Sequence, residues 1–232
     1  MKEETPLPDL SRCVRKFKQT FRHVPDGELE TFLENASVKE YRKGELVYAE
    51  NTRVKGCFLL YSGAVKIFQT GSEGKEQIIR LGKEGDIFGF RSIIMEEPTC
   101  TSTRALAPCV LCRVPGRALL QAIDRDPAFA REMIQIACKE LGEANRYIKN
   151  IAQKTVRTRL AESLLHIATD FGIEEDGMLL LNLTREDLGN LVGTATETLI
   201  RLLSDLKNER IVEARGRRLR ILDVEKLREL SR

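Results

Sequence analysis

Apolar and polar residues follow two different periodicities, which divide the chain into a β-rich part and a helical part. Between residues 36 and 115, short runs rich in β-branched and aromatic residues are separated by glycines. The runs read SVKEY, ELVYAE, GCFLLYSG, AVKIFQT, QIIRLG and STRALAPCVLCRV. Short strands between frequent turn residues are typical of a small sandwich or barrel. The segment DGELETFLENA, just before these strands, predicts a short helix.

A long helix is predicted after the pair Asp126-Pro127, which is typical of helix starts, and should run to about Lys154. One apolar stripe along it has alternating spacings of four and three residues, the heptad pattern of a coiled coil. This stripe comprises Ala130, Ile134, Ala137, Leu141, Ala144, Ile148 and Ile151. A second stripe, expected to face the β-rich part, comprises Phe129, Met133, Ile136 and Tyr147. Two stripes on one helix favour a parallel homodimer; burial of the helix within its own domain is the alternative.

The remaining residues, 155–232, predict a helix (TVRTRLAESLLHIATDF), a short strand (MLLLNL), two further helices and a hairpin. Two spacings typical of helix N-terminal caps, Thr184 with Asp187 and Thr194 with Glu197, lie ten residues apart. Two short helices joined at Gly193 predict a helix-turn-helix. The following hairpin is a basic wing that carries Arg215, Arg217, Arg218 and Arg220.

The stretch GTATETLIRLL places a mixed polar face opposite the leucines of the second helix. That face comprises Thr196, Glu197, Ile200, Arg201 and Ser204. Arginine can bond a guanine edge, glutamate can accept from a cytosine amino group, and isoleucine can contact a thymine methyl. The alternative is an exposed Glu–Arg ion pair worth only about 0.2–0.5 kcal/mol. With the wing and the dimer helix, this face predicts sequence-specific binding of duplex DNA by a two-fold dimer.

Composition narrows the function classes further. The 232 residues carry a net charge of only +3, so a nucleic-acid-binding surface must be local. Residues 201–220 provide it, with seven Lys and Arg against three Asp and Glu. The absence of a signal-peptide pattern and of an apolar run of ~18 residues predicts a soluble, cytoplasmic protein. No GxSxG, Walker or HExxH motif occurs, so neither an enzyme nor a metal site is expected.

The six cysteines are expected to be reduced thiols, because no secretion signal accompanies them. Cys109 and Cys112 form a CxxC within the apolar run ALAPCVLCRV. Residues three apart in a strand point to opposite faces, so these two sulfurs should not converge. A thiol redox enzyme would depend on this motif alone. His166 lies in ESLLHIA and is expected to be packed.

The run LLYSGAVKIFQTGSEGKEQIIRLGKEGDIFG resembles the cyclic-nucleotide-binding β-roll, and LTREDLGNLVGTATETLIRLL resembles the DNA-reading motif of the Crp–Fnr regulators. The resemblance covers nearly the whole chain. It implies an α+β fold with a β-roll sensor domain (1–125), a dimerisation helix (126–153), a hinge near Lys154 and a winged helix-turn-helix (154–232). It also implies a homodimer on an inverted DNA repeat and contact with RNA polymerase. The alternative is a sensory module that acts through protein interaction, against which the basic wing argues.

The resemblance also implies residue roles in the DNA-binding part. Glu197 and Arg201 match the pair that reads a G·C base pair, whereas Thr196 and Ile200 depart from both main branches of the family. The cyclic-AMP branch has Arg and Gly at these two positions, and the Fnr branch commonly Val and Ser. Arg185 matches a phosphate-contacting arginine. The full predicted DNA-binding set is Arg185, Thr196, Glu197, Ile200, Arg201, Ser204, Arg215, Arg217 and Arg218.

The sensor part departs further from the resemblance. Cyclic-AMP binders carry Gly-Glu at the start of a phosphate cassette and Arg-Ser or Arg-Thr at its end. Here Phe90 replaces the glutamate, Thr99 or Cys100 replaces the arginine, and Arg91 would point elsewhere in a strand. An unpaired buried phosphate is costly, so tight cyclic-AMP binding is not expected. The effector pocket implied by the resemblance comprises Gly89, Phe90, Arg91, Ser92, Thr99, Cys100, Thr101, Ala144 and Asn145, the last two matching the Thr-Ser pair that meets the adenine.

Other effectors stay open. An iron–sulfur sensor needs several clustered N-terminal cysteines, and only Cys13 lies there. Haem, nitric oxide or a redox signal remains an alternative, because relatives use a modified β-roll pocket for haem. Cys57, Cys100, Met95 and His23 are candidate atoms, but no spacing selects among them.

Overall fold

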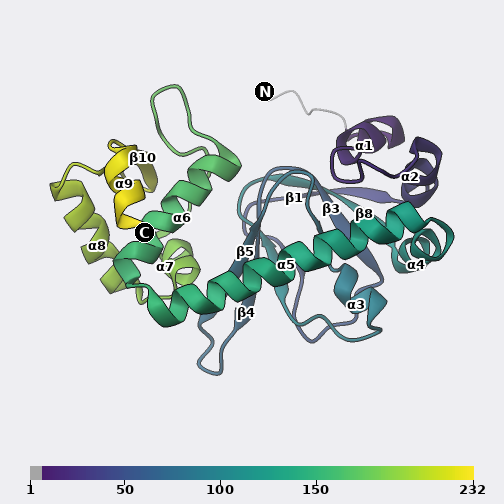
Figure 1. Cartoon of the computed structure of the whole chain (residues 1–232), viewed down its shortest axis with the longest axis horizontal. Helices are drawn as coiled ribbons and strands as arrows, with labels where there is room; N and C mark the ends of the chain where they lie inside the picture. The colour runs from purple at the N-terminus through teal and green to yellow at the C-terminus, as the bar shows by residue number, and fades with distance from the viewer. Residues whose placement is uncertain (1–6) are drawn as a thin grey trace. The chain divides into compact units, whose positions relative to one another are not determined.

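The computed structural model describes residues 7–232 (Figure 1). Contacts between residues divide the chain into two compact units. Unit 1 comprises Met1–Ile67 and Leu81–Gly142, and unit 2 comprises Phe68–Arg80 and Glu143–Arg232. No described helix combines the length and the apolar character needed to cross a membrane.

The β-rich part forms two four-stranded sheets, as the spacing of short strands and glycines predicts. One sheet has the order β1 (Ser37–Tyr41), β8 (Cys109–Pro115), β3 (Gly56–Ser62), β6 (Ile87–Phe88). The other has the order β2 (Leu46–Tyr48), β7 (Ser102–Ala105), β4 (Val65–Thr70), β5 (Glu76–Gly82). The run STRALAPCVLCRV therefore splits into two strands that belong to different sheets. The predicted α+β class with an N-terminal β-roll is confirmed.

Two apolar clusters hold the β-roll together. The inner cluster contains the stacked rings of Tyr48, Phe58 and Phe88, whose centroids lie 5.5 and 5.7 Å apart along the stack. On the opposite face of β3 and β8, a second cluster packs against α1 (Leu10–Phe17), α2 (Asp26–Leu33), α4 (Gly116–Arg125) and the start of α5 (Pro127–Gln153). Cys112 belongs to this helix-facing cluster and Cys109 to the inner one, which confirms that the CxxC sulfurs point to opposite faces.

The two apolar stripes of α5 have different environments. Phe129 and Met133 of the second stripe are buried in the helix-facing cluster, where the Phe129 ring lies 4.7 Å from that of Phe32. In the heptad stripe, the side chains of Ile134, Leu141 and Ile148 are 63%, 62% and 65% exposed. The alternative in which the whole helix is buried within its own domain is therefore wrong.

The C-terminal part is a small helical unit with a hairpin. It contains α6 (Val156–Phe171), α7 (Arg185–Val192), α8 (Thr196–Asn208), β9 (Val212–Arg215), β10 (Arg218–Ile221) and α9 (Val224–Leu230). Its buried side chains include Leu160, Leu164, Leu188, Val192, Leu199, Leu203, Leu206 and Leu227. Leucines at these helical spacings bury one face of each helix, as their sequence periodicity predicts.

Several local predictions were wrong or incomplete. MLLLNL does not form a strand; it makes isolated bridges from Leu179 to Ile173 and from Met178 to Arg220. Leu179, Leu181 and Leu183 are buried, whereas Leu180 is exposed. His166 is exposed rather than packed. Four short helices were missed, namely α1, α3 (Phe90–Ile94), α4 and α9.

Candidate nucleic-acid interface

Helix α7 begins with a side-chain cap and ends at a glycine, which makes the turn to α8. Thr184 caps α7, since its hydroxyl accepts from the Asp187 amide at 2.9 Å and donates to the Asp187 carboxylate at 2.7 Å. Gly193 ends α7 with φ 75° and ψ 53°, a left-handed conformation that favours glycine. A Cβ on Gly193 would also lie 3.0 Å from the Ile151 side chain of α5. The left-handed backbone conformation favours glycine here, and a larger residue would also have to displace the Ile151 side chain.

The predicted cap of α8 was wrong by one residue. The N-cap is Ala195, which makes no side-chain bond, while the Thr194 amide donates to the Gly189 carbonyl at 3.0 Å. Gly189 lets the two helices approach, because a Cβ there would lie 3.3 Å from the Thr194 carbonyl oxygen. A glycine inside an otherwise helical pattern was the available signal for this close approach.

The polar face of α8 is presented as the sequence predicts. Leu199, Leu203 and Leu206 are buried, and Glu197, Ile200, Arg201 and Ser204 are exposed, with Thr196 half-buried at the start of the helix. Within residues 7–232, the side chains of Glu197 and Arg201 make no intramolecular hydrogen bond or ion pair. The alternative explanation of this pair as a helix-stabilising ion pair is therefore not realised.

The wing presents only part of its charge to solvent. β9 and β10 pair antiparallel around Gly216, with Arg217 exposed at the turn and Arg215 bonded to Glu213 at 2.8 Å. The Arg218 guanidinium is paired with Glu174. Arg220 lies 3.5 Å from the Asp176 carboxylate. Of the three wing residues predicted to contact DNA, Arg217 is exposed at the turn, whereas Arg215 and Arg218 each have a carboxylate partner within the chain.

Arg185 connects the wing to the helix-turn-helix. Its Nη2 donates to the Gly216 carbonyl at 2.9 Å, and burial lowers the pKa of its guanidinium, which remains charged. Its Nη1 is buried and has no hydrogen-bond partner among the described residues. The predicted phosphate-contacting residue therefore also fixes the wing turn relative to the start of α7.

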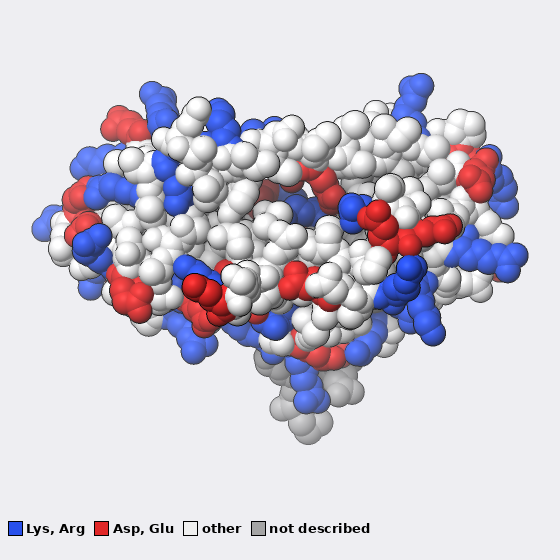
Figure 2. Space-filling view, turned by 90° about the horizontal axis from the view of Figure 1, so that it is seen from below, with Lys and Arg blue, Asp and Glu red and all other residues white. Residues whose placement is uncertain are grey.

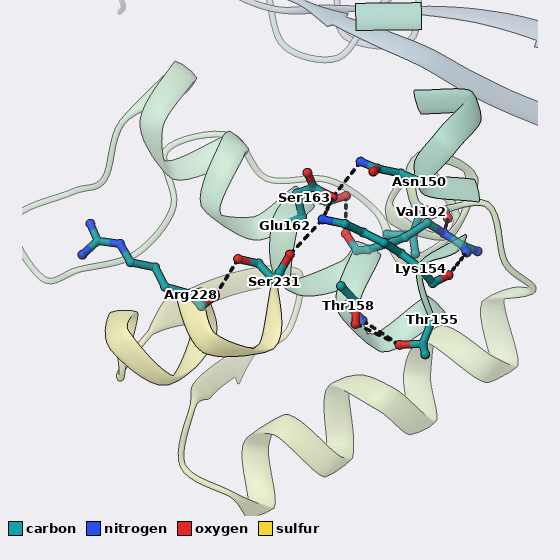
Figure 3. Close-up of polar contacts among 10 residues, drawn as sticks. Asn150, Lys154, Thr155, Thr158, Glu162, Ser163, Val192, Arg228 and Ser231 are labelled. Carbon is teal, nitrogen blue, oxygen red and sulfur yellow. Dashed lines mark hydrogen bonds and ion pairs between the residues drawn. The ribbon is translucent and has the colours of Figure 1, made fainter. Parts of the chain in front are cut away.

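A polar cluster lies where α5 ends and α6 begins, near the predicted hinge (Figure 3). Lys154 bonds the Glu162 carboxylate at 3.2 Å and the Ser231 carbonyl at 2.8 Å, and Asn150 donates to the same carboxylate at 2.9 Å. Thr155 caps α6 by accepting from the Thr158 amide at 3.2 Å. The last turn of α5 is thereby bound to both α6 and the end of α9.

One guanidinium extends this cluster to the helix-turn-helix. Arg159 donates to the Lys154 carbonyl at 2.8 Å, to the Val192 carbonyl at 2.9 Å and to the Gly193 carbonyl at 3.2 Å. These carbonyls lie at the C-terminal ends of α5 and α7, where helix carbonyls lack partners within the helix. Arg159 thereby bonds the end of α5 to the turn before α8.

The effector cassette residues lie on α3 and the loops around it, not on a strand. Gly89 has φ 77° and precedes α3, and Phe90 is buried in the helix-facing cluster. Arg91 is exposed and bonds Glu97 at 2.9 Å, while the buried Ser92 hydroxyl donates to the Gly89 carbonyl at 3.0 Å. The expectation of strand geometry at Arg91 was wrong, but this side chain is directed to a surface carboxylate.

The end of the cassette is bound to a neighbouring loop. The buried Thr99 hydroxyl donates to the Ala49 carbonyl at 2.7 Å and lies 3.1 Å from the Thr52 carbonyl. Cys100 is exposed, and Thr101 is half-buried. Ala144, half-buried, and Asn145, exposed, lie on the part of α5 that belongs to unit 2.

The inner face of the roll contains stacked aromatic rings beside aliphatic side chains. A Cβ on Gly89 would lie 3.3 Å from the Phe58 ring and 3.7 Å from the Tyr48 ring. Thr103, two residues before the inner-cluster residue Ala105, is fully buried, and its hydroxyl has no hydrogen-bond partner in the described part of the chain. Thr103 could not be singled out from the sequence, because a threonine in a strand carries no signal of an unpaired hydroxyl.

The candidate atoms for a haem or redox signal have dissimilar environments. Cys57 is buried in the helix-facing cluster, where burial raises the pKa of its thiol to about 12. Met95 and Cys100 are exposed, and His23 bonds the Glu132 carboxylate at 2.6 Å. Among residues 7–232, no group of three or more His, Cys, Asp or Glu side chains is placed to hold a metal ion.

Charge is mixed on the molecular surface as well as in the composition. Figure 2 shows basic and acidic side chains interspersed over the face drawn there. This distribution agrees with the net charge of +3 and with a local rather than global nucleic-acid-binding surface.

Comparisons with known proteins cover both parts of the chain. Residues 38–126 match the cyclic nucleotide-binding domain, and residues 158–230 match the Crp-like helix-turn-helix domain. The CRP-like cAMP-activated global transcriptional regulator of Mycobacterium tuberculosis is 25% identical over 214 residues, which cover 91% of this chain and 96% of that protein. The fumarate and nitrate reduction regulatory protein of Vibrio cholerae is 25% identical over 195 residues, covering 83% and 78%. The structure of FixK2 from Bradyrhizobium japonicum aligns with a TM-score of 0.76 at 27% identity, covering 85% of this chain and 98% of that one.

Proposed function

The chain belongs to the Crp/Fnr family of DNA-binding transcription regulators, which are not enzymes, and on this basis we propose how it reads DNA. Two copies joined along α5 bind an inverted repeat, and each copy places α8 in the major groove of one half-site. Half-site centres then lie about one helical turn apart, as in other two-fold helix-turn-helix dimers. Contact with RNA polymerase, which the family resemblance implies, stays a prediction.

The observation that carries this proposal is the unpaired state of Glu197 and Arg201 on an exposed helix face. Their donors and acceptors are available to a base pair without breaking an internal bond. Arg201 would donate to a guanine and Glu197 would accept from a cytosine amino group. Arg215 and Arg217 of the wing would contact phosphates, and Arg185 would fix the wing that presents them.

The proposed dimer is supported by the exposed stripe of α5. Ile134, Leu141 and Ile148 recur every seven residues and are more than 60% exposed in the single chain. Large apolar side chains at heptad spacing fit a second copy of the same helix in a parallel coiled coil. Each would contribute about 1.5–3 kcal/mol at full burial.

For the effector, we propose that tight binding of cyclic AMP is absent. Phe90 cannot accept a ribose hydroxyl, Arg91 is paired with Glu97, and the Thr99 hydroxyl is bonded to a loop carbonyl. A cyclic phosphate in the cassette would lack a cation. Titration calorimetry should detect no binding at micromolar concentrations, and micromolar or tighter binding would refute this part of the proposal.

Selection of binding sites from random duplex DNA tests the reading of DNA. The full-length protein should recover an inverted repeat with one G·C pair per half-site that depends on Arg201. Arg201→Ala should lose selectivity at that pair and keep it elsewhere. Recovery of single half-sites, or equal loss of selectivity from Arg201→Ala and Arg217→Ala, would contradict the assignment.

A further inference from the structure

Two buried cysteines from distant parts of the sequence meet in unit 1. The Sγ atoms of Cys13 and Cys112 lie 3.2 Å apart, although 99 residues separate them in the chain. Both belong to the helix-facing cluster and are 2% and 0% exposed. This contact joins α1, near the N-terminus, to β8 in the middle of its sheet.

The two thiols are electrostatically unequal. The hydrogen bond from Cys112 lowers the pKa of Cys13, because it stabilises the Cys13 thiolate against the opposing effects of burial and of Asp9. The pKa of Cys112 is raised, first by the same hydrogen bond and then by burial. Of the two thiols, Cys13 is therefore the one whose thiolate is favoured.

Other buried cysteines lack this activation. Burial raises the pKa of the Cys57 thiol to about 12 and that of Cys109 to about 11. The thiolate is the reactive form of cysteine, so these two thiols stay protonated and inert near neutral pH. Among the buried cysteines of the described chain, only Cys13 and Cys112 combine a sulfur partner with an activated member.

We propose that Cys13 and Cys112 form a reversible disulfide, a redox-sensitive site that connects α1 to β8. With hydrogen peroxide as oxidant, the Cys13 thiolate attacks one peroxide oxygen, the O–O bond breaks, and Cys13 becomes a sulfenic acid as hydroxide leaves. Cys112 sulfur then attacks the Cys13 sulfur, the S–O bond breaks, and water leaves with the Cys112 proton. Two thiols and one peroxide give one disulfide and two waters, and a dithiol reductant reverses the change.

Closing the bond requires only a small movement. A disulfide has a sulfur–sulfur distance of about 2.05 Å, so the two atoms must approach by about 1 Å. β8 is held between β1 and β3, whereas α1 is an eight-residue helix whose outer face is exposed. We therefore expect α1 to make most of the movement, and its local opening to admit the oxidant.

The site lies in a core shared with the dimer helix. Phe129 and Met133 of α5 belong to the same helix-facing cluster as Cys13 and Cys112. A disulfide would fix α1 against the core on which α5 begins. The inference is independent of the proposed reading of DNA, because its test counts thiols and requires no DNA binding.

The experiment uses the full-length chain with the exposed thiols removed by Cys100→Ser and Cys138→Ser. The reduced protein is treated with hydrogen peroxide, unfolded, alkylated with N-ethylmaleimide and analysed by mass spectrometry. We expect the loss of two alkylatable thiols, a cross-linked peptide pair containing Cys13 and Cys112, and recovery of both thiols after dithiothreitol. Cys57 and Cys109 should stay alkylatable throughout.

A further Cys13→Ser substitution is the control, and circular dichroism should verify that it folds. It should abolish the cross-linked peptide and leave all remaining thiols alkylatable, whereas Cys109→Ala should leave the cross-link in place. The proposal is wrong if Cys13 and Cys112 both remain alkylatable after oxidation of the protein that carries only Cys100→Ser and Cys138→Ser. It is also wrong if Cys112 pairs with Cys57 instead.

Discussion

On α8, Glu197 and Arg201 extend from an exposed helix face and have no partner in residues 7–232, whereas in the effector cassette the corresponding polar groups are bonded internally. There, Arg91 pairs with Glu97, and the Thr99 hydroxyl bonds the loop that contains Ala49. Both regions match domains of one family, yet only one of them keeps its recognition groups available.

This difference supports the proposed reading of DNA and the proposed absence of tight cyclic-AMP binding. A polar group that binds a ligand must either be unpaired beforehand or exchange an existing bond, and the exchange reduces the net gain. The α8 face needs no exchange to meet a base pair. The cassette would have to give up the Arg91–Glu97 pair and the Thr99 bonds before these groups could bind a phosphate.

The largest expected effect comes from the exposed heptad stripe of α5. The proposed reading of an inverted repeat needs two α8 helices, and this stripe is the proposed dimer contact that brings them together. Leu141→Asp combined with Ile148→Asp should convert the dimer to monomers in sedimentation and abolish binding to an inverted repeat. Each side chain contributes about 1.5–3 kcal/mol when buried, and a charge in an apolar seam adds a further penalty. Glu140→Asp, a charge-conserving change on the same helix, should leave the dimer intact. A double variant that stays a tight dimer would place the interface elsewhere.

Arg201 of α8, which has no side-chain partner within residues 7–232, and Arg91 of the cassette, which is paired with Glu97, test whether an unpaired arginine is the one that binds DNA. Arg201→Ala should cost about 1–3 kcal/mol of binding free energy at one base pair and relax selectivity there. Arg91→Ala removes an arginine that is already paired in the cassette, so DNA affinity should not change. Fluorescence anisotropy with matched and substituted half-sites measures both effects. Equal losses from the two variants would show that paired and unpaired arginines do not differ as argued.

Two buried threonines test whether a hydrogen-bonded hydroxyl in the β-roll contributes more to the free energy of unfolding than one without a partner. Thr99→Val removes a hydroxyl that bonds loop carbonyls, and should lower the free energy of unfolding by about 1–3 kcal/mol. Thr103→Val removes a buried hydroxyl that has no partner among the described residues, so it should be neutral or stabilising. Urea denaturation of both variants gives the two free energies. Destabilisation of similar size by both would mean that Thr103 has an unrecognised polar partner.

Periodic features of the fold were predictable, and tertiary pairings were not. The strands follow from β-branched and aromatic runs between glycines, α5 from its heptad spacing, and the helix-turn-helix from its glycine turn, and each of these is a local signal. The Cys13–Cys112 contact joins residues 99 apart, and the Arg218–Glu174 pair joins residues 44 apart, so neither leaves a trace in local sequence. The proposed reading face could be singled out from the sequence, because it combines residue types suited to base edges with a helical spacing. That the Glu197 and Arg201 side chains lack partners within the described residues was visible only in three dimensions.

The smallest expected effect concerns the wing. Arg217 is exposed at the hairpin turn, and the proposal assigns it to a phosphate, where it acts through release of condensed counterions. Arg217→Ala should therefore weaken binding to all sequences alike and reduce the slope of log K against log salt by about 1. Arg218→Ala is the matched control: its guanidinium is paired with Glu174, so the slope should change less. A sequence-dependent loss from Arg217→Ala would instead assign the wing to base contacts, and the division between a reading helix and a phosphate-binding wing would have to be abandoned.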